Sequence, residues 1–158
     1  MEWLPQTVPP GERTSIVHGD YRLDNMVLHA SEPRVIAVLD WELSTLGDPL
    51  ADFTYYLMSW VLPRDARSSL GGVDLGPLGI PSLEQIVARY CTLTGRESIA
   101  NLDWYFAYNS FRLACILQGI AGRVRDGTAA SAHALEMIKR IRPLASAASG
   151  FAQRAGMP

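Results

Sequence analysis

The stretch His18-Gly19-Asp20-Tyr21-Arg22-Leu23-Asp24-Asn25 decides the fold of this chain, together with Val38-Leu39-Asp40-Trp41-Glu42 downstream. Three polar residues in these stretches matter because of their spacing. Four residues separate Asp20 from Asn25, and fourteen separate Asn25 from Asp40. A carboxylate, an amide and a second carboxylate at this spacing bring their oxygen atoms together only if the chain folds back between the last two.

The intervening residues have the pattern of a β hairpin. Residues 26–29 are predicted as one short strand, 30–33 as the turn and 35–39 as the return strand, since apolar runs flank a polar, proline-containing stretch. The midpoint between Asn25 and Asp40 falls inside that turn. We therefore expect these two residues to face each other across the open end of the hairpin, about 5 Å apart.

Oxygen atoms from Asn25 and Asp40 suit a divalent cation. Mg²⁺ takes oxygen ligands and usually uses one or two carboxylates, with phosphate and water completing its shell. Asp20 would stand beside such an ion without binding it. The spacing alone leaves a structural interpretation open for each residue. Asp20 would cap a turn, Asn25 would be a turn residue with left-handed backbone, and Asp40 would cap the next segment.

The order of these motifs resembles the protein-kinase-like fold and, in detail, the aminoglycoside phosphotransferase family. His18-Gly19-Asp20 and Leu39-Asp40-Trp41-Glu42 resemble its catalytic-loop and metal-binding motifs, and Gly47-Asp48-Pro49-Leu50-Ala51-Asp52 follows as in that family. Residues 104–127 resemble later helices of the branch fused to, or encoded near, acyl-CoA dehydrogenases. The resemblance covers about residues 15–137. It implies an α+β, mainly α fold: the C-terminal lobe of a kinase-like fold with a small β hairpin.

The resemblance also implies roles for four residues. Asp20 would be the catalytic base that orients the hydroxyl group of a small-molecule substrate, and Arg22 would approach the transferred phosphate. Asn25 and Asp40 would bind Mg²⁺ and, through it, the ATP or GTP that donates the phosphoryl group. For Arg22 the alternative is an ion pair with Asp24.

The N-terminal lobe of that fold is expected to be absent from this chain. Only 17 residues precede His18, and they contain no glycine-rich phosphate loop. Two functions follow from this expectation. The first is the catalytic lobe of a small-molecule phosphotransferase, and the alternative is an inactive lone C-terminal lobe that acts as a binding or assembly module. Because the uncovered roof of the cleft would be apolar, the expected partner is a second copy in a homodimer or a separate N-terminal lobe.

Composition argues against several other classes of protein. The net charge is −2 and no long basic run occurs, so nucleic-acid binding through a cationic surface is not expected. No apolar run reaches the roughly 18 residues needed to span a bilayer, and the N-terminus lacks a signal-peptide pattern. Cys91 and Cys115 fall in helix-like stretches and are expected to be buried free thiols, which is typical of a cytoplasmic protein.

Proline and glycine positions predict the organisation of the domain. Residues 1–13 are expected to form an extended N-terminal segment, 14–150 the kinase-like lobe, and 151–158 a fraying tail. Within the lobe, the catalytic loop spans 18–25, the metal-binding hairpin spans 26–42, and helices continue to residue 149. The predicted helices begin near residues 48, 82, 101 and 129, with a long loop over 63–81 and a kink or break at Pro143.

Neighbours of the motifs are predicted to have structural roles. His18 is expected to pack beneath the loop and to bond to backbone, Asp52 to anchor the catalytic-loop backbone, and Trp41 to lie in the core. Arg112 lies inside an apolar helix, where an unpaired charge would be costly. Its expected partners are the acidic residues Glu42, Asp48 and Asp52. Three aromatic residues either line a substrate cleft or belong to the core: Trp104, Tyr105 and Tyr108.

Overall fold

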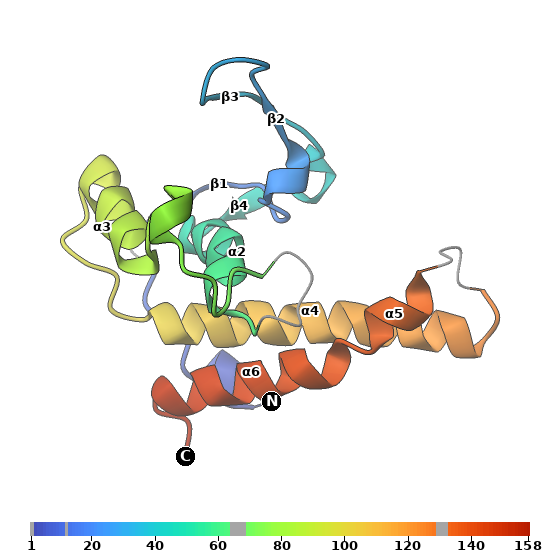
Figure 1. Ribbon diagram of the computed structural model, residues 1–158. Coiled ribbons are helices and arrows are strands. Elements are labelled where there is room, and N and C mark those ends of the chain that lie inside the picture. The colour runs from blue at the N-terminus through green and yellow to red at the C-terminus, as the bar shows by residue number, and fades with distance from the viewer. Residues whose placement is uncertain (1, 12, 64–68, 129–132) are drawn as a thin grey trace.

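The computed structural model of the chain describes residues 2–11, 13–63, 69–128 and 133–158, and it is mostly helical (Figure 1). Short strands and single 3-10 turns, labelled η, occupy the first third of the chain. The elements in chain order are α1 (Trp3–Gln6), β1 (Ser15–Val17), η1 (Leu23–Asn25), β2 (Met26–Leu28), β3 (Val35–Val38), η2 (Trp41–Leu43), β4 (Thr45–Gly47), α2 (Leu50–Val61), η3 (Gly76–Leu78), α3 (Leu83–Thr94), α4 (Leu102–Arg125), α5 (Ala134–Ile138) and α6 (Ile141–Arg154).

Three helices form the body of the molecule. The long helix α4 lies between α2 on one side and α6 on the other (Figure 1). Leu57 of α2, Phe106 of α4 and two residues of α6, Leu144 and Phe151, are buried in one apolar cluster. Because burial of apolar surface is the main favourable term in folding, this cluster fixes the position of α2. α2 also carries Asp52, which holds the catalytic loop by hydrogen bonds.

The β structure projects from the α2 side of this body (Figure 1). β1, which leads into His18, pairs antiparallel with β4, with Ile16 opposite Leu46. β4 had no counterpart in the prediction. β2 and β3 pair antiparallel as the expected hairpin, and the α+β, mainly α fold class is confirmed.

The register of the hairpin differs from the predicted one by one residue. Met26 pairs with Val38, and the Leu39 amide donates to the Asn25 carbonyl with the two atoms 2.8 Å apart. Leu39 therefore lies opposite Asn25, and Asp40 is the next residue along. A midpoint estimate assumes a symmetric turn, whereas a bulge beside Val27 gives the two strands unequal numbers of residues.

Helix ends follow the predicted capping signals. Ser82 and Gln85 form a capping box at the start of α3, each side chain accepting a hydrogen bond from the other's backbone amide. Gly95 ends that helix in the left-handed conformation, with φ of 63°. Asp48 accepts a hydrogen bond from the amide of Leu50 at 2.9 Å just before α2, whereas the N-cap position itself is occupied by Pro49, which makes no side-chain cap.

Both ends of the chain are more ordered than the sequence predicted. The segment 1–13 is not wholly extended, because α1 forms in it and Trp3 packs against the apolar clusters. The segment 151–158 is not a fraying tail. α6 continues to Arg154, and the side chains of Phe151 and Ala152 are each 6% exposed.

The last predicted helix is divided in two, as its proline suggested. The break lies at Lys139 and Arg140, between α5 and α6. Pro143 itself sits in the first turn of α6, where a missing backbone N–H costs little. Residues 129–132 of this prediction, and residues 64–68 of the predicted loop, lie outside the described residues.

Among the described residues, none of the helices combines the length and apolar character needed to cross a membrane. Both cysteines are free thiols. Cys91 is buried as expected, but Cys115 is exposed, so the prediction of two buried thiols was wrong for the second. Cys115 and Ile116, which is 50% exposed, lie on the outer side of α4, while Ala114 and Leu117 on either side of them face the core.

Replacing Phe151 with alanine tests whether the C-terminal turns belong to the core. Its ring lies 5.3 Å from that of Phe106. We expect Phe151→Ala to lower the free energy of unfolding by about 3–5 kcal/mol, since it leaves a cavity in a packed cluster. Chemical denaturation measures the change. The control Gln153→Ala, exposed on the same helix, should change stability by less than about 0.5 kcal/mol, and equal small effects would contradict the packing described here.

Candidate active site

Asp52 holds the catalytic loop by its backbone. It lies in the first turn of α2, and its two carboxylate oxygens accept hydrogen bonds from the amides of His18 at 2.5 Å and Gly19 at 3.0 Å. Hydrogen bonds to a charged acceptor are stronger than those between neutral groups. The predicted anchoring role of Asp52 is confirmed, and it fixes the backbone immediately before Asp20.

His18 joins the catalytic loop to the end of the hairpin. The imidazole is 2% exposed. Its Nδ1 accepts from the amide of Asp20 at 3.2 Å, and its Nε2 lies 2.7 Å from the carbonyl oxygen of Leu39. Because Nδ1 accepts and Nε2 faces a carbonyl, this geometry requires the neutral tautomer protonated at Nε2. The expected packing role of His18 is confirmed, and it links Asp20 to the residue before Asp40.

Gly19 occupies a position that other residues cannot fill. Its φ is 86°, and a Cβ there would lie 2.7 Å from the carbonyl oxygen of Leu43. The Gly19 carbonyl accepts a hydrogen bond from the guanidinium of Arg112. Arg112 thus reaches the catalytic loop and bonds to a carbonyl there, and the prediction of an acidic partner was wrong. A backbone acceptor satisfies a guanidinium donor without placing a second charge in the helix packing.

Asp20 and Asn25 are brought together as predicted. The side-chain nitrogen of Asn25 donates to the Asp20 carbonyl at 2.9 Å and to Oδ2 of the Asp20 carboxylate at 3.1 Å. The side-chain nitrogen, and not the oxygen, of the Asn25 amide therefore faces Asp20. The turn formed by η1 is therefore closed by contacts between two of the candidate residues.

Arg22 forms an ion pair with Asp24, as its alternative interpretation predicted. Its guanidinium contacts the carboxylate of Asp24, and both side chains are largely exposed, at 47% and 66%. Partial burial lowers the pKa of Arg22, but hydrogen bonding and charge interaction with Asp24 outweigh this and raise it above its ordinary value. Exposed ion pairs contribute little free energy, so Arg22 can exchange this partner for another anion.

Asp40 has a strained backbone at the end of the hairpin. Its φ of 66° is the one positive value for a non-glycine residue in the described chain, and such strain often marks a functional position. Asp40 precedes η2, but its side chain makes no capping hydrogen bond there. The capping interpretation of Asp40 was therefore wrong, and its exposed carboxylate stands at the hairpin end next to the Asn25–Leu39 pair.

Asn25 and Asp40 carry the oxygen donors that a magnesium ion bound to phosphate would use. No group of three or more His, Cys, Asp or Glu side chains able to hold a metal occurs in the part of the chain that the structure describes. One carboxylate from Asp40 and one amide oxygen from Asn25 leave most coordination positions to phosphate and water. Mg²⁺ in nucleotide sites is commonly bound in this way.

Trp41 is not a core residue, contrary to prediction. It is 48% exposed, its indole N–H donates to the Val38 carbonyl at 2.8 Å, and its ring centre lies 4.7 Å from that of His18. The 3-10 turn η2 directs this side chain along the hairpin instead of into the helical body. Trp41 therefore covers His18 from outside.

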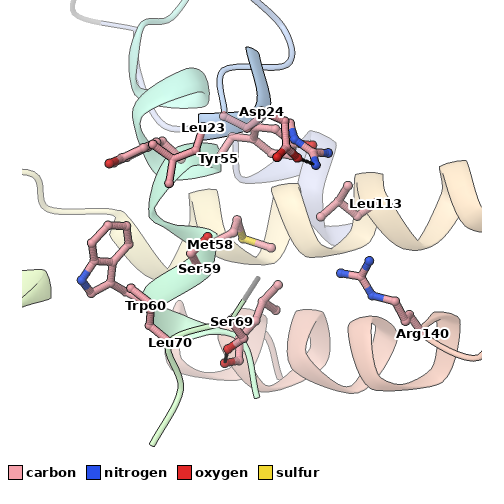
Figure 2. A pocket seen from close by; sticks show the side chains of 13 residues that line it. Leu23, Asp24, Tyr55, Met58, Ser59, Trp60, Ser69, Leu70, Leu113 and Arg140 are labelled. Carbon is pink, nitrogen blue, oxygen red and sulfur yellow. Dashed lines mark hydrogen bonds and ion pairs between the residues drawn. The ribbon is translucent and has the colours of Figure 1, made fainter. Parts of the chain in front are cut away.

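A cavity of about 280 Å³ opens beside the catalytic loop (Figure 2). Figure 2 shows Leu23, Asp24 and Tyr55 at one end of it and Arg140 at the other. Neither Tyr55 nor Arg140 belongs to a recognisable motif: Tyr55 lies within α2, and Arg140 lies between α5 and α6. The lining residues are Arg22, Leu23, Asp24, Tyr55, Tyr56, Met58, Ser59, Trp60, Leu62, Ser69, Leu70, Leu113 and Arg140.

The aromatic residues proposed for a substrate cleft lie elsewhere. Trp104 and Tyr105 are buried, and with Tyr108 they line a different cavity, under Val8 and Pro9. The Tyr105 hydroxyl donates to Asp48, so this acid links the start of α2 to α4.

Replacing Gly19 with alanine tests the close approach of Gly19 to Leu43. We expect Gly19→Ala to lower the free energy of unfolding by at least about 2 kcal/mol, because the left-handed backbone and the clash with Leu43 add together. The control Gly122→Ala lies within α4 with open space around it and should raise stability by about 0.5–1 kcal/mol. Denaturant unfolding measures both, and a neutral result for Gly19→Ala would contradict the described loop.

Comparisons with known proteins agree with this geometry. The model of the "Phosphotransferase enzyme family" matches residues 1–114. The chain is 42% identical to acyl-CoA dehydrogenase family member 10 of Mus musculus, over 99% of this chain and 15% of that protein. It is 37% identical to acyl-CoA dehydrogenase family member 11 of Homo sapiens, over 97% of this chain and 20% of that protein.

A crystal structure from Ralstonia eutropha, of a "putative aminoglycoside phosphotransferase", superposes with a TM-score of 0.90 at 49% identity. The match covers 99% of this chain and 48% of that chain. The chain thus spans a fifth or less of the two dehydrogenase-family proteins and about half of the solved structure. The resemblance drawn from the motifs is confirmed: the chain belongs to the phosphotransferase enzyme family, and its fold is that of the C-terminal lobe of a kinase-like protein.

Proposed function

We propose that these residues form the catalytic lobe of a phosphotransferase that moves the γ-phosphoryl group of ATP or GTP to a hydroxyl group of a small molecule. One observation carries the proposal. Asp20 and Asn25 are bonded to each other in a loop that Asp52 and His18 hold rigidly, and the loop opens beside a cavity. Phosphoryl transfer depends mainly on positioning and on charge stabilisation, and this loop supplies both.

Each candidate residue has a role in this scheme. Asp20 accepts the hydrogen bond of the substrate hydroxyl and orients its oxygen toward the phosphorus atom. Arg22 leaves its weak pair with Asp24 and neutralises charge on the transferred group. Asn25 and Asp40 hold Mg²⁺, which when bound offsets the negative charge of the nucleotide phosphates.

The cavity beside the loop is proposed to receive the acceptor. A polycationic aminoglycoside would need several carboxylates in its site, yet among the described lining residues only Asp24 carries one, and Arg22 pairs with it. Apolar side chains such as Met58 and Leu113 make up much of the wall. These features favour a hydroxylated metabolite or hydroxyacyl compound over an aminoglycoside. We place the reaction in the cytoplasm, where ATP is available and free thiols persist.

A second candidate function is a binding or assembly module without catalysis. Large apolar side chains are exposed over the hairpin and the β1–β4 pair. Single exposed apolar residues are ordinary, but many gathered in one region mark an interaction surface. A homodimer or a separate N-terminal lobe would cover them. These side chains are Ile16, Leu23, Leu28, Val35, Ile36, Leu39, Trp41, Leu43 and Leu46.

Calorimetric titration of Mg²⁺-ATP into the chain distinguishes the two functions. Phosphotransferase function predicts heat of binding that Asp40→Ala abolishes or weakens at least tenfold, because a metal ligand is lost. The control Asp126→Ala removes an exposed acid at the far end of α4 and should bind as the unaltered chain does. Equal heat with Asp40→Ala would refute the metal site, and no heat even at millimolar nucleotide would support the second candidate.

Two substitutions at Asp40 separate its backbone strain from its chemistry. Asp40→Gly and Asp40→Ala both remove the carboxylate, but only glycine adopts φ near 66° without steric cost. We expect Asp40→Gly to be more stable than Asp40→Ala by about 1 kcal/mol, while neither binds Mg²⁺-ATP. Thermal or denaturant unfolding measures the difference. If both variants unfold alike, the left-handed backbone at this position is wrong.

A further inference from the structure

We propose that Tyr55 and Arg112 are positioning residues for Asp20, acting on the catalytic loop from α2 and α4. The inference rests on the proposed function, because the direction of the Asp20 carboxylate matters only if this carboxylate orients a substrate hydroxyl. Neither residue belongs to the motifs that identify the loop. Both become visible only when the helices are packed against it.

Arg112 links three parts of the molecule. It is partly buried near the middle of α4, and its guanidinium donates to the carbonyl of Gly19, the residue before Asp20. The central carbon of the guanidinium also lies 5.2 Å from the centre of the Tyr55 ring. A guanidinium is planar and carries five N–H donors, so it can stack on a ring and hold a carbonyl together. A lysine offers a single ammonium group and cannot do both.

Tyr55 completes the link from the side chain of Asp20. Its ring lies at the end of the cavity beside Asp24 (Figure 2). Burial raises the pKa of Tyr55 from 10.0 to about 12, and a hydrogen bond and charge interaction with Asp20 act in the same direction, against Arg22 and Arg112. Tyr55 therefore remains protonated at every physiological pH, and in the proposed arrangement its hydroxyl donates to the Asp20 carboxylate.

Asp20 thus receives two side-chain donors. The amide nitrogen of Asn25 lies 3.1 Å from Oδ2 of the carboxylate, and the proposal makes the Tyr55 hydroxyl, held under the Arg112 guanidinium, the second donor. Together they hold the carboxylate in one direction before a substrate arrives, while Arg112 holds the backbone beneath it. A misplacement of about 1 Å in such a group can reduce a rate by about 100-fold, so two fixed donors affect catalysis without touching the substrate.

A purely structural role for the two residues makes a different prediction. If Arg112 and Tyr55 served only to pack the helices, their removal would lower stability and leave kcat of the folded protein unchanged. Ionisation of Tyr55 shows whether the three side chains are electrostatically coupled, and it requires no enzyme activity. The value of kcat then separates positioning from packing.

Tyrosinate absorbance of the 158-residue chain, recorded after rapid pH jumps, measures this ionisation. The signal of Tyr55 is the difference between each protein and the same protein carrying Tyr55→Phe. We expect the Tyr55 midpoint to fall by about one pH unit in Asp20→Asn, because an acceptor charge is lost, and to rise in Arg112→Met, because a nearby cation is lost. Arg125→Met, exposed at the end of the same helix, should leave it unchanged.

A Tyr55 midpoint that stays the same in Asp20→Asn or in Arg112→Met would overturn the proposal. Should Arg112→Met fail to fold, Arg112→Gln removes the charge but keeps a donor for Gly19, and the same upward shift is expected. In a transfer assay, Tyr55→Phe should lower kcat by roughly 10- to 100-fold and leave the nucleotide KM within about twofold. An unchanged kcat would also overturn the proposal. If no transfer occurs at all, the proposed function fails, while the titration still decides whether the three side chains are coupled.

Discussion

The two hydrogen bonds that Asp52 accepts from the amides of His18 and Gly19 are the constraint on which the site depends. A loop that begins with a short strand and ends in a single 3-10 turn has little stability of its own. Asp52 transfers to it the rigidity of α2, whose position is set by the apolar cluster between α2, α4 and α6. The helical body therefore determines where Asp20 stands.

Two residues with positive φ and one buried imidazole also hold the catalytic loop and the hairpin end in place. Gly19 adopts a positive φ beneath Leu43, Asp40 does so despite its side chain, and His18 is a buried imidazole in one fixed tautomer. Each exception costs free energy locally and places a polar atom near the end of the hairpin. Sites that accept such costs are usually those where function, and not stability, determines the residue.

Local patterns predicted much of this molecule, because their causes lie within a few residues of one another. The hairpin, the capping box at Ser82 and the anchoring role of Asp52 could all be inferred from spacing and residue type. The pairing of β1 with β4 could not, since two three-residue strands separated by 27 residues carry no local signal. The burial of Phe151 and the exposure of Trp41 depend on how distant elements pack, which periodicity does not specify.

In the candidate site, too, contacts between residues close in sequence were predictable and contacts between distant elements were not. Asp20 and Asn25 come together because they share one turn, and that contact was predictable. The register that places Leu39 opposite Asn25 depends on a bulge, and the partner of Arg112 is a backbone carbonyl. Neither the bulge nor the backbone partner of Arg112 can be predicted from residue types alone. Arg112 was therefore assigned an acidic partner when only the sequence was considered, and Tyr55 was assigned no role.

The most direct test of the account is to replace Mg²⁺ with Mn²⁺ in the presence of ATP and to record paramagnetic broadening in the isotope-labelled chain. A shared ion at the hairpin end predicts that the side-chain amide signal of Asn25 and the backbone signal of Asp40 broaden first. Signals from Cys91 on α3 and Leu135 on α5 should remain sharp. Broadening that is absent, or that centres on another part of the chain, would contradict a metal site held by Asn25 and Asp40.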